Sequence, residues 1–124
     1  MLKDAKLQPM VSTARPDAAR AFYGETLGLP LVSEDMFALV YAVGGEDLRV
    51  AKAPAVAPSP YAVMGFRVTD IAAEAARLIA AGVAFERYGF LTQDSAGIWS
   101  APRGAKVAWF RDPDGNLLSL MQPE

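Results

Sequence analysis

Apolar and polar residues along the first half of the chain follow the periods of a strand, a helix and three further strands. Asp17 is expected to cap the helix, whose apolar residues share one face, and Gly28 to end it. Gly44 and Gly45 predict a tight hairpin between the last two strands. Pro9 restricts the first strand to an edge or a late start. The predicted strands are 7–14, 29–34, 36–43 and 47–53.

The same order of elements returns in the second half. Asp70 is expected to cap a helix with one apolar face, and Gly82 to end it. Two strands of a hairpin meet at the Asp-Pro-Asp-Gly turn of residues 112–115. This recurrence predicts an internal repeat, whereas the alternative is two unrelated pieces of similar appearance. The segments that resemble strands are 61–68, 83–90, 97–102 and the hairpin 106–122.

A proline-rich stretch separates the two halves and predicts a stiff connector. The chain of 124 residues has the length of one domain. We expect a single domain, 1–124, built from a module 1–53, a linker 54–60 and a module 61–124. Four strands from each half with helices on one face predict an α+β fold with two curved sheets.

Composition and charge exclude several classes of function. Lysines and arginines are scattered singly and the net charge is −2, so no basic stripe for nucleic acid is expected. No apolar run is long enough to cross a membrane, and the N-terminus has no signal-peptide pattern, which predicts a cytoplasmic protein. Cysteine and histidine are absent, so thiolate chemistry, the commonest general base and the commonest metal ligand are excluded.

Two motifs carry a resemblance to a known family. The segment 15–29, RPDAARAFYGETLGL, and the segment 108–120, AWFRDPDGNLLSL, resemble the opening and closing motifs of the vicinal oxygen chelate superfamily. That superfamily includes glyoxalase I, extradiol dioxygenases, fosfomycin-resistance enzymes and bleomycin-binding proteins. The resemblance implies two βαβββ modules that form a curved eight-stranded mixed sheet around a cavity, and a homodimer.

The resemblance also marks where metal-using members carry their ligands, and this chain departs from the pattern at each place. The usual glutamate, the seventh residue after Asp112, is Ser119. The usual histidine or glutamine positions hold Met10 and Val63, and the last strand of the first module offers Arg49 and its neighbours. Divalent metals prefer nitrogen or charged oxygen ligands. We therefore expect neither a metal nor another cofactor.

Strand alternation together with the resemblance predicts which side chains face the cavity. Trp109, Met121, Met10 and Trp99 would make an apolar wall, with cationic anchors in Arg67 and Arg49. Alternatives stay open: the methionines as core fillers, Trp99 as the anchor of its own loop, and Arg67 in an ion pair across a dimer interface. The complete predicted set is Trp109, Arg67, Ser119, Met121, Trp99, Met10, Ser12 and Arg49.

The favoured interpretation is a metal-free protein that binds a hydrophobic or aromatic small molecule, with drug sequestration as one role such capture could serve. A glyoxalase-like isomerase or lyase with a non-standard metal, or with none, is the alternative. It would need an acid such as Tyr41, Tyr61 or Tyr88 and a base such as Glu34 or Glu86. A partner domain with a vestigial cavity is a third possibility.

Overall fold

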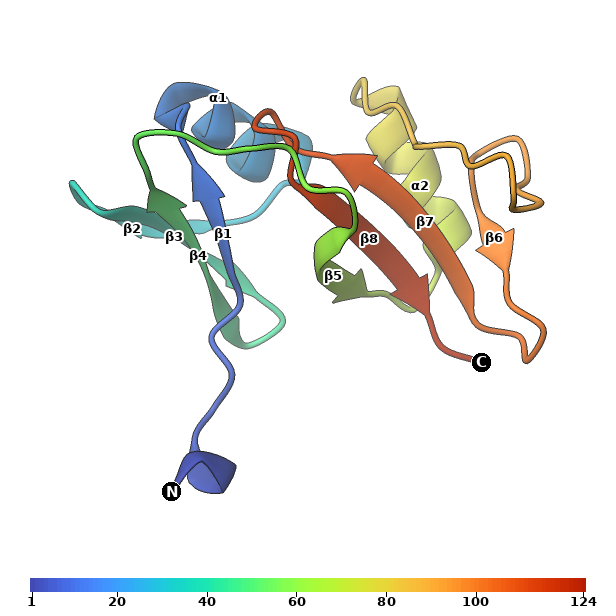
Figure 1. The fold of residues 1–124 in the computed structure, drawn as a ribbon, viewed down its shortest axis with the longest axis horizontal. Helices are drawn as coiled ribbons and strands as arrows, with labels where there is room; N and C mark the ends of the chain where they lie inside the picture. Colours follow the sequence, from blue (N-terminus) through green and yellow to red (C-terminus); the bar gives the residue numbers. More distant parts are fainter. The chain divides into compact units, whose positions relative to one another are not determined.

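The computed structural model describes all residues from Met1 to Glu124 and divides into two compact units, 1–56 and 57–124. Each unit contains one four-stranded sheet (Figure 1), with strand order β1-β4-β3-β2 in the first and β5-β8-β7-β6 in the second. Each sheet is mixed, since one strand pair is parallel and the other pairs are antiparallel. The α+β class is confirmed, and the eight strands form two separate sheets.

Unit 1 follows the predicted order of elements with shorter strands. The α-helix α1 spans Pro16–Arg20 and continues as a π-helix, η2, over Ala21–Thr26. Asp17 does not cap α1 as predicted, because Pro16 takes the first helical position and Arg15 the N-cap. The strands are β1 (Met10–Thr13), β2 (Leu31–Glu34), β3 (Ala38–Val43) and β4 (Glu46–Lys52).

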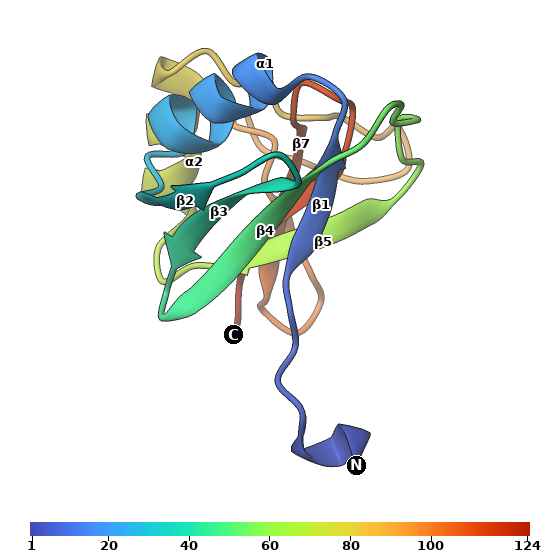
Figure 2. The same ribbon diagram turned by 90° about the vertical axis from the view of Figure 1, so that its left-hand side faces the viewer.

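Helical residues cover one face of the sheet of unit 1. Tyr23 from η2 packs on Tyr41 from β3 with ring centroids 6.0 Å apart, and both side chains are fully buried. Val11 and Val50 are buried on the same face of the sheet. The chain before β1, with the short helix η1 (Leu2–Asp4), extends away from this sheet and is exposed (Figure 2).

Unit 2 keeps its predicted helix but has less strand than expected. The helix α2 (Ile71–Ala80) begins at Asp70, whose carboxylate accepts a hydrogen bond from Ala73 N at 3.1 Å. No strand forms within 83–90, and the expected strand in 97–102 is reduced to β6 (Trp99–Ser100). The other strands are β5 (Ala62–Arg67), β7 (Lys106–Arg111) and β8 (Leu117–Gln122).

The core of unit 2 lies between α2 and one face of its sheet. Leu118, Leu120 and Phe110 are buried on the same side as Ile71 and Leu78 of the helix. None of the helices in the chain has the length and apolar character that a bilayer-crossing segment requires.

The β7–β8 turn is held by a buried aspartate. The Oδ1 atom of Asp112 accepts hydrogen bonds from the backbone N–H groups of Asp114 (2.9 Å) and Asn116 (3.0 Å), and its Oδ2 accepts one from Asn116 Nδ2 (2.8 Å). Gly115 has a φ of 83°, and a Cβ there would lie 3.0 Å from Pro58 Cβ. Asp112 therefore has a structural role in this turn.

The hydroxyl group of Tyr41 is buried without a hydrogen-bond partner, which generates the first prediction. Tyr41→Phe removes a polar atom whose desolvation is uncompensated, so the free energy of unfolding should rise by about 1 kcal/mol. Urea denaturation measures the change. Tyr61→Phe, at a side chain that is 70% exposed, is the control and should have no effect. A loss of stability in Tyr41→Phe would contradict the prediction.

Candidate binding site

The face of the unit 2 sheet opposite α2, called here the open face, collects every predicted site residue of this unit. The strand register aligns these side chains in two neighbouring rows, with adjacent strands about 4.8 Å apart. The rows are Trp99, Val107, Met121 and Arg67, and then Trp109, Ser119 and Gly65. Strand alternation thus brings five predicted residues onto one surface while Leu118 and Leu120 point into the core.

An aromatic cluster, Tyr88, Phe90, Trp99 and Trp109, lies at the β6–β7 side of the open face. The indole rings of Trp99 and Trp109 are 6.2 Å apart at an angle of 33°. Tyr88 meets Trp109 edge-on with ring centroids 5.5 Å apart, and the rings of Tyr88 and Phe90 are 5.7 Å apart at an angle of 35°. Both tryptophans keep part of their surface accessible. Partly exposed indole rings offer a stacking surface to a planar molecule.

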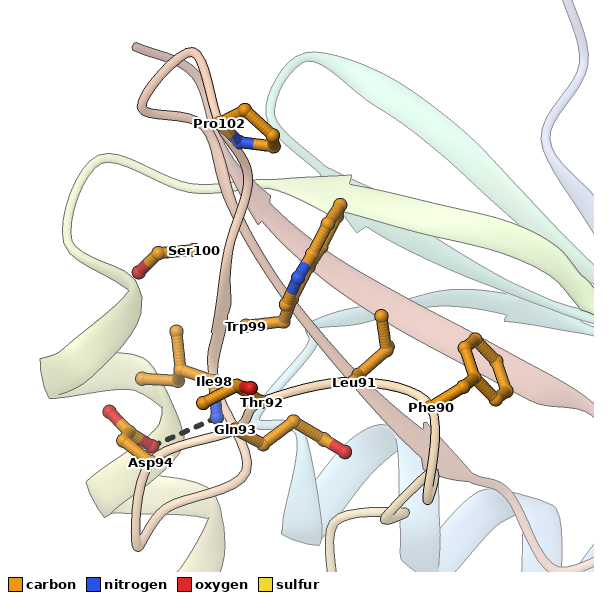
Figure 3. Close-up of a pocket in the computed structure, with 9 residues that line it drawn as sticks. All are labelled: Phe90, Leu91, Thr92, Gln93, Asp94, Ile98, Trp99, Ser100 and Pro102. Atoms are coloured by element: carbon orange, nitrogen blue, oxygen red, sulfur yellow. Dashed lines mark hydrogen bonds between the residues drawn. The ribbon is translucent and has the colours of Figure 1, made fainter.

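A cavity of about 580 Å³ adjoins the cluster beside β6 (Figure 3). Trp99 and Leu91 project to one side of the strand, and Ser100 and Ile98 to the other. The lining of the cavity is therefore apolar next to the indole of Trp99 and includes polar groups next to Asp94. The lining residues are Phe90, Leu91, Thr92, Gln93, Asp94, Ile98, Trp99, Ser100 and Pro102.

Ser119 lies against the neighbouring strand. A Cβ added to Gly65 would be only 2.6 Å from Ser119 Oγ, so the hydroxyl group occupies the space above a residue that has no side chain. A neutral hydroxyl in this position does not fit a divalent ion as the usual glutamate would. No group of three or more carboxylates, histidines or cysteines in the chain is arranged to hold a metal ion.

The predicted residues of unit 1 share one face of its sheet. Met10 is paired with Arg49 and Ser12 with Ala51 in the parallel β1–β4 ladder. This face is opposite the one that Tyr23 and Tyr41 cover, and Met10 is 49% exposed. The structure thus brings Met10, Ser12 and Arg49 together on the surface of unit 1.

The acids and bases considered for catalysis have other roles. Glu34 accepts hydrogen bonds from Arg20 Nη2 (2.6 Å) and Lys52 Nζ (3.0 Å), and these cations lower its pKa to about 2. Glu86 is bonded to Arg111 Nε at 2.8 Å. Burial raises the pKa values of Tyr41 and Tyr88, so both phenols stay protonated at neutral pH. No hydrogen bond joins Tyr41 to Glu34 or Tyr88 to Glu86, although each glutamate lies near enough to its tyrosine to raise the pKa of the phenol further.

The contribution of Tyr88 and Phe90 to the cluster was not predicted from the sequence. Tyr88 was considered only as an acid, and the segment 83–90 was expected to be a strand. The run Phe85, Tyr88 and Phe90 ahead of the Gly- and Ser-containing loop was the available signal. It indicates aromatic side chains close to Trp99 but does not specify their positions.

Comparison with known proteins identifies the family. The model of the Glyoxalase/Bleomycin resistance protein/Dioxygenase superfamily matches residues 7–120. The chain belongs to this superfamily. The match confirms the resemblance inferred from the motifs at 15–29 and 108–120. A comparison with curated protein sequences gave no match.

Solved structures of the superfamily share this fold. A bleomycin resistance determinant encoded on transposon Tn5 is 25% identical with a TM-score of 0.76, covering 97% of this chain and 98% of its own. A bleomycin-binding protein in complex with bleomycin is 26% identical with a TM-score of 0.73, covering 97% and 99%. Lactoylglutathione lyase from Agrobacterium tumefaciens, 18% identical with a TM-score of 0.74 over 96% and 93%, shows likeness of fold alone.

The contact between Ser119 and Gly65 can be tested with a double-mutant cycle. Gly65→Ala should lower the free energy of unfolding by about 1 kcal/mol, because the new methyl group displaces the hydroxyl group from its rotamer. Ser119→Ala removes the clashing atom, so the double variant should recover most of the loss. Chemical denaturation of the four proteins gives the coupling. Additive effects of the two substitutions would show that these groups do not touch.

Proposed function

We propose that this protein captures a planar hydrophobic or aromatic small molecule without a metal ion, by stacking it on the indoles of Trp99 and Trp109. The observation that carries the proposal is the aromatic cluster on the open face, next to a cavity of about 580 Å³. Binding sites for small molecules are concave and mostly apolar, with a few polar groups that orient the ligand. The cluster and the adjoining cavity supply both kinds of surface.

Arg67 is the cationic anchor in this proposal. It is exposed at the end of β5, in the same row as Met121 and Trp99, and forms no ion pair in the chain. The strand residues of the open face include no carboxylate, while Arg111 is already bonded to Glu86. A guanidinium group so placed favours an anionic or carbonyl-bearing group on the ligand.

The similarity to bleomycin-binding proteins supports binding as the activity. One of those structures contains bleomycin, so the fold accommodates a small molecule. Drug sequestration remains one role for this chain, but the cation at Arg67 disfavours a positively charged drug. We further propose that the protein works as a homodimer in the cytoplasm and needs no cofactor. Met10, Ser12 and Arg49 are the proposed ligand-binding residues on the surface of unit 1.

Metal content is the first test of the proposal. The untagged protein should contain no stoichiometric metal, and addition of Ni²⁺, Zn²⁺, Mn²⁺ or Fe²⁺ should leave its melting temperature unchanged, because the usual ligand positions hold Met10, Val63 and Ser119. Elemental analysis and thermal shift measure both quantities. Stoichiometric binding of one of these ions, with a large increase in the melting temperature, would overturn the metal-free proposal and favour the isomerase or lyase.

Ligand binding can be followed by tryptophan fluorescence. A screen of planar aromatic compounds should include 4-nitrobenzoate and the neutral 4-nitrobenzyl alcohol, which quench indole emission when they stack on it. Trp109→Phe should weaken binding of both, because the larger stacking surface is lost. Arg67→Ala should weaken 4-nitrobenzoate alone, by about two- to fivefold, as expected for an exposed charge pair.

Arg77→Ala provides the matched control for charge, because Arg77 pairs with Glu74 on α2, which packs on the face of the sheet opposite the open face. It should leave both affinities unchanged. Equal losses for the anion and the alcohol in Arg67→Ala would contradict the role of this residue. The absence of any response across the whole screen would count against the binding function itself.

A further inference from the structure

The side chain of Gln93 forms hydrogen bonds with three backbone groups of segment 86–98, which carries Tyr88 and Phe90 of the aromatic cluster and leads into Trp99. Its Nε2 donates hydrogen bonds to Glu86 O (2.9 Å) and Gly97 O (2.8 Å), and its Oε1 accepts one from Tyr88 N (2.8 Å). Gln93 also forms an isolated β-bridge with Trp99. One partly buried side chain therefore reaches both the segment that presents Tyr88 and Gly97, two residues before β6.

Only a primary amide suits this position. The three partners require two donors and one acceptor at the end of a single side chain, and a carboxylate or an alkyl group cannot provide this combination. Asparagine has the same amide on a shorter stem, which cannot reach all three backbone groups at once. The carbonyl groups of Glu86 and Gly97 would lose a donor in any other variant.

The second half of the segment is held independently of Gln93. The carboxylate of Asp94 accepts hydrogen bonds from Ala96 N and Ile98 N, both at 2.9 Å, the latter drawn in Figure 3. Gly97 has a φ of 95°, and a Cβ there would lie 2.9 Å from Phe85 Cβ. The turn 94–98 is thus preformed, and Gln93 joins it to the chain at Glu86 and Tyr88.

We propose that Gln93 is the positioning residue of the aromatic site: its amide group sets Tyr88 and Trp99 at their observed angles to Trp109. The inference rests on the proposed function, since the positioned rings are the stacking surface. Trp109 belongs to β7, whose ladder with β8 is regular, whereas Tyr88 belongs to irregular chain. Glu86 N donates to Trp109 O at 2.8 Å, so Gln93 adds the connection that β-pairing does not supply.

The test compares Gln93→Leu and Gln93→Glu with Gln8→Leu. Gln8 is a matched control, because its amide group also makes two hydrogen bonds to backbone carbonyls, of Pro9 and Asp47, away from the aromatic cluster. Two indoles 6.2 Å apart couple their transitions and give a pair of circular-dichroism bands of opposite sign. Trp99→Phe identifies these bands by abolishing them.

Gln93→Leu should abolish or strongly weaken the paired bands and lower affinity for 4-nitrobenzoate about tenfold, while Gln8→Leu leaves both unchanged. Gln93→Glu retains the acceptor for Tyr88 N and should recover part of the signal at acidic pH, where the protonated carboxyl group regains one donor. This recovery separates positioning from a general loss of folding.

Unchanged bands in a folded Gln93→Leu protein would overturn the inference, as would equal losses in the Gln8 control. If the bands respond as expected but the wild-type protein binds no aromatic probe, Gln93 does position the rings and the proposed binding function is the part that fails. Failure of the positioning role is therefore seen in the circular-dichroism bands, and failure of the binding function is seen in the binding of aromatic probes to the wild-type protein.

Discussion

The register of the β7–β8 hairpin determines which side chains this protein can present to a ligand. Side chains alternate between the two faces of a strand, so a slip of one residue would move Trp109 and Ser119 into the core and Leu118 onto the open face. The register begins at Asp112, whose three accepted hydrogen bonds close the turn from within. The Asp-Pro-Asp-Gly motif therefore has no assigned contact with a ligand, but it fixes which side chains of β7 and β8 lie on the open face.

Alternation explains why much of the site could be predicted from the sequence. The strands around Trp109, Ser119 and Met121 have a period that α2 and the buried leucines enforce, and the structure follows it. Asp70 was also recognisable, because capping is a local property. Asp17 was not, since the preceding Pro16 competes for the start of α1. Residues 83–90 have a strand-like composition, but the ring contact of Phe85 with Phe110 (5.5 Å) and the amide of Gln93 direct them into irregular chain.

Replacement of a metal ligand by Ser119 changes the kind of interaction that the fold can offer. A metal ion polarises one oxygen atom of a substrate and demands a defined geometry from it. Indole rings offer dispersion and quadrupole attraction, which depend on shape and vary little among planar ligands. Gly65 has no side chain, so nothing projects from β5 at the centre of the open face. Ser119 Oγ fills the space where a Cβ of residue 65 would lie. In the proposed function, the same strand positions would therefore favour capture over oxyanion stabilisation.

In the proposed function, selectivity would come from the periphery of the stacking surface. Arg67 lies on β5, at the opposite edge of the sheet from Trp99 on β6, and three strand spacings of about 4.8 Å separate their backbones. The long side chains of Arg67 and Trp99 can cover part of that distance, and a ligand that uses both groups needs its ring at one end and its charge at the other. Trp99 also lines the cavity beside β6, so a substituent can enter there without leaving the indole. Because β6 has only two residues and follows irregular chain, small changes in segment 86–98 would alter ligand preference while the rest of the sheet stays the same.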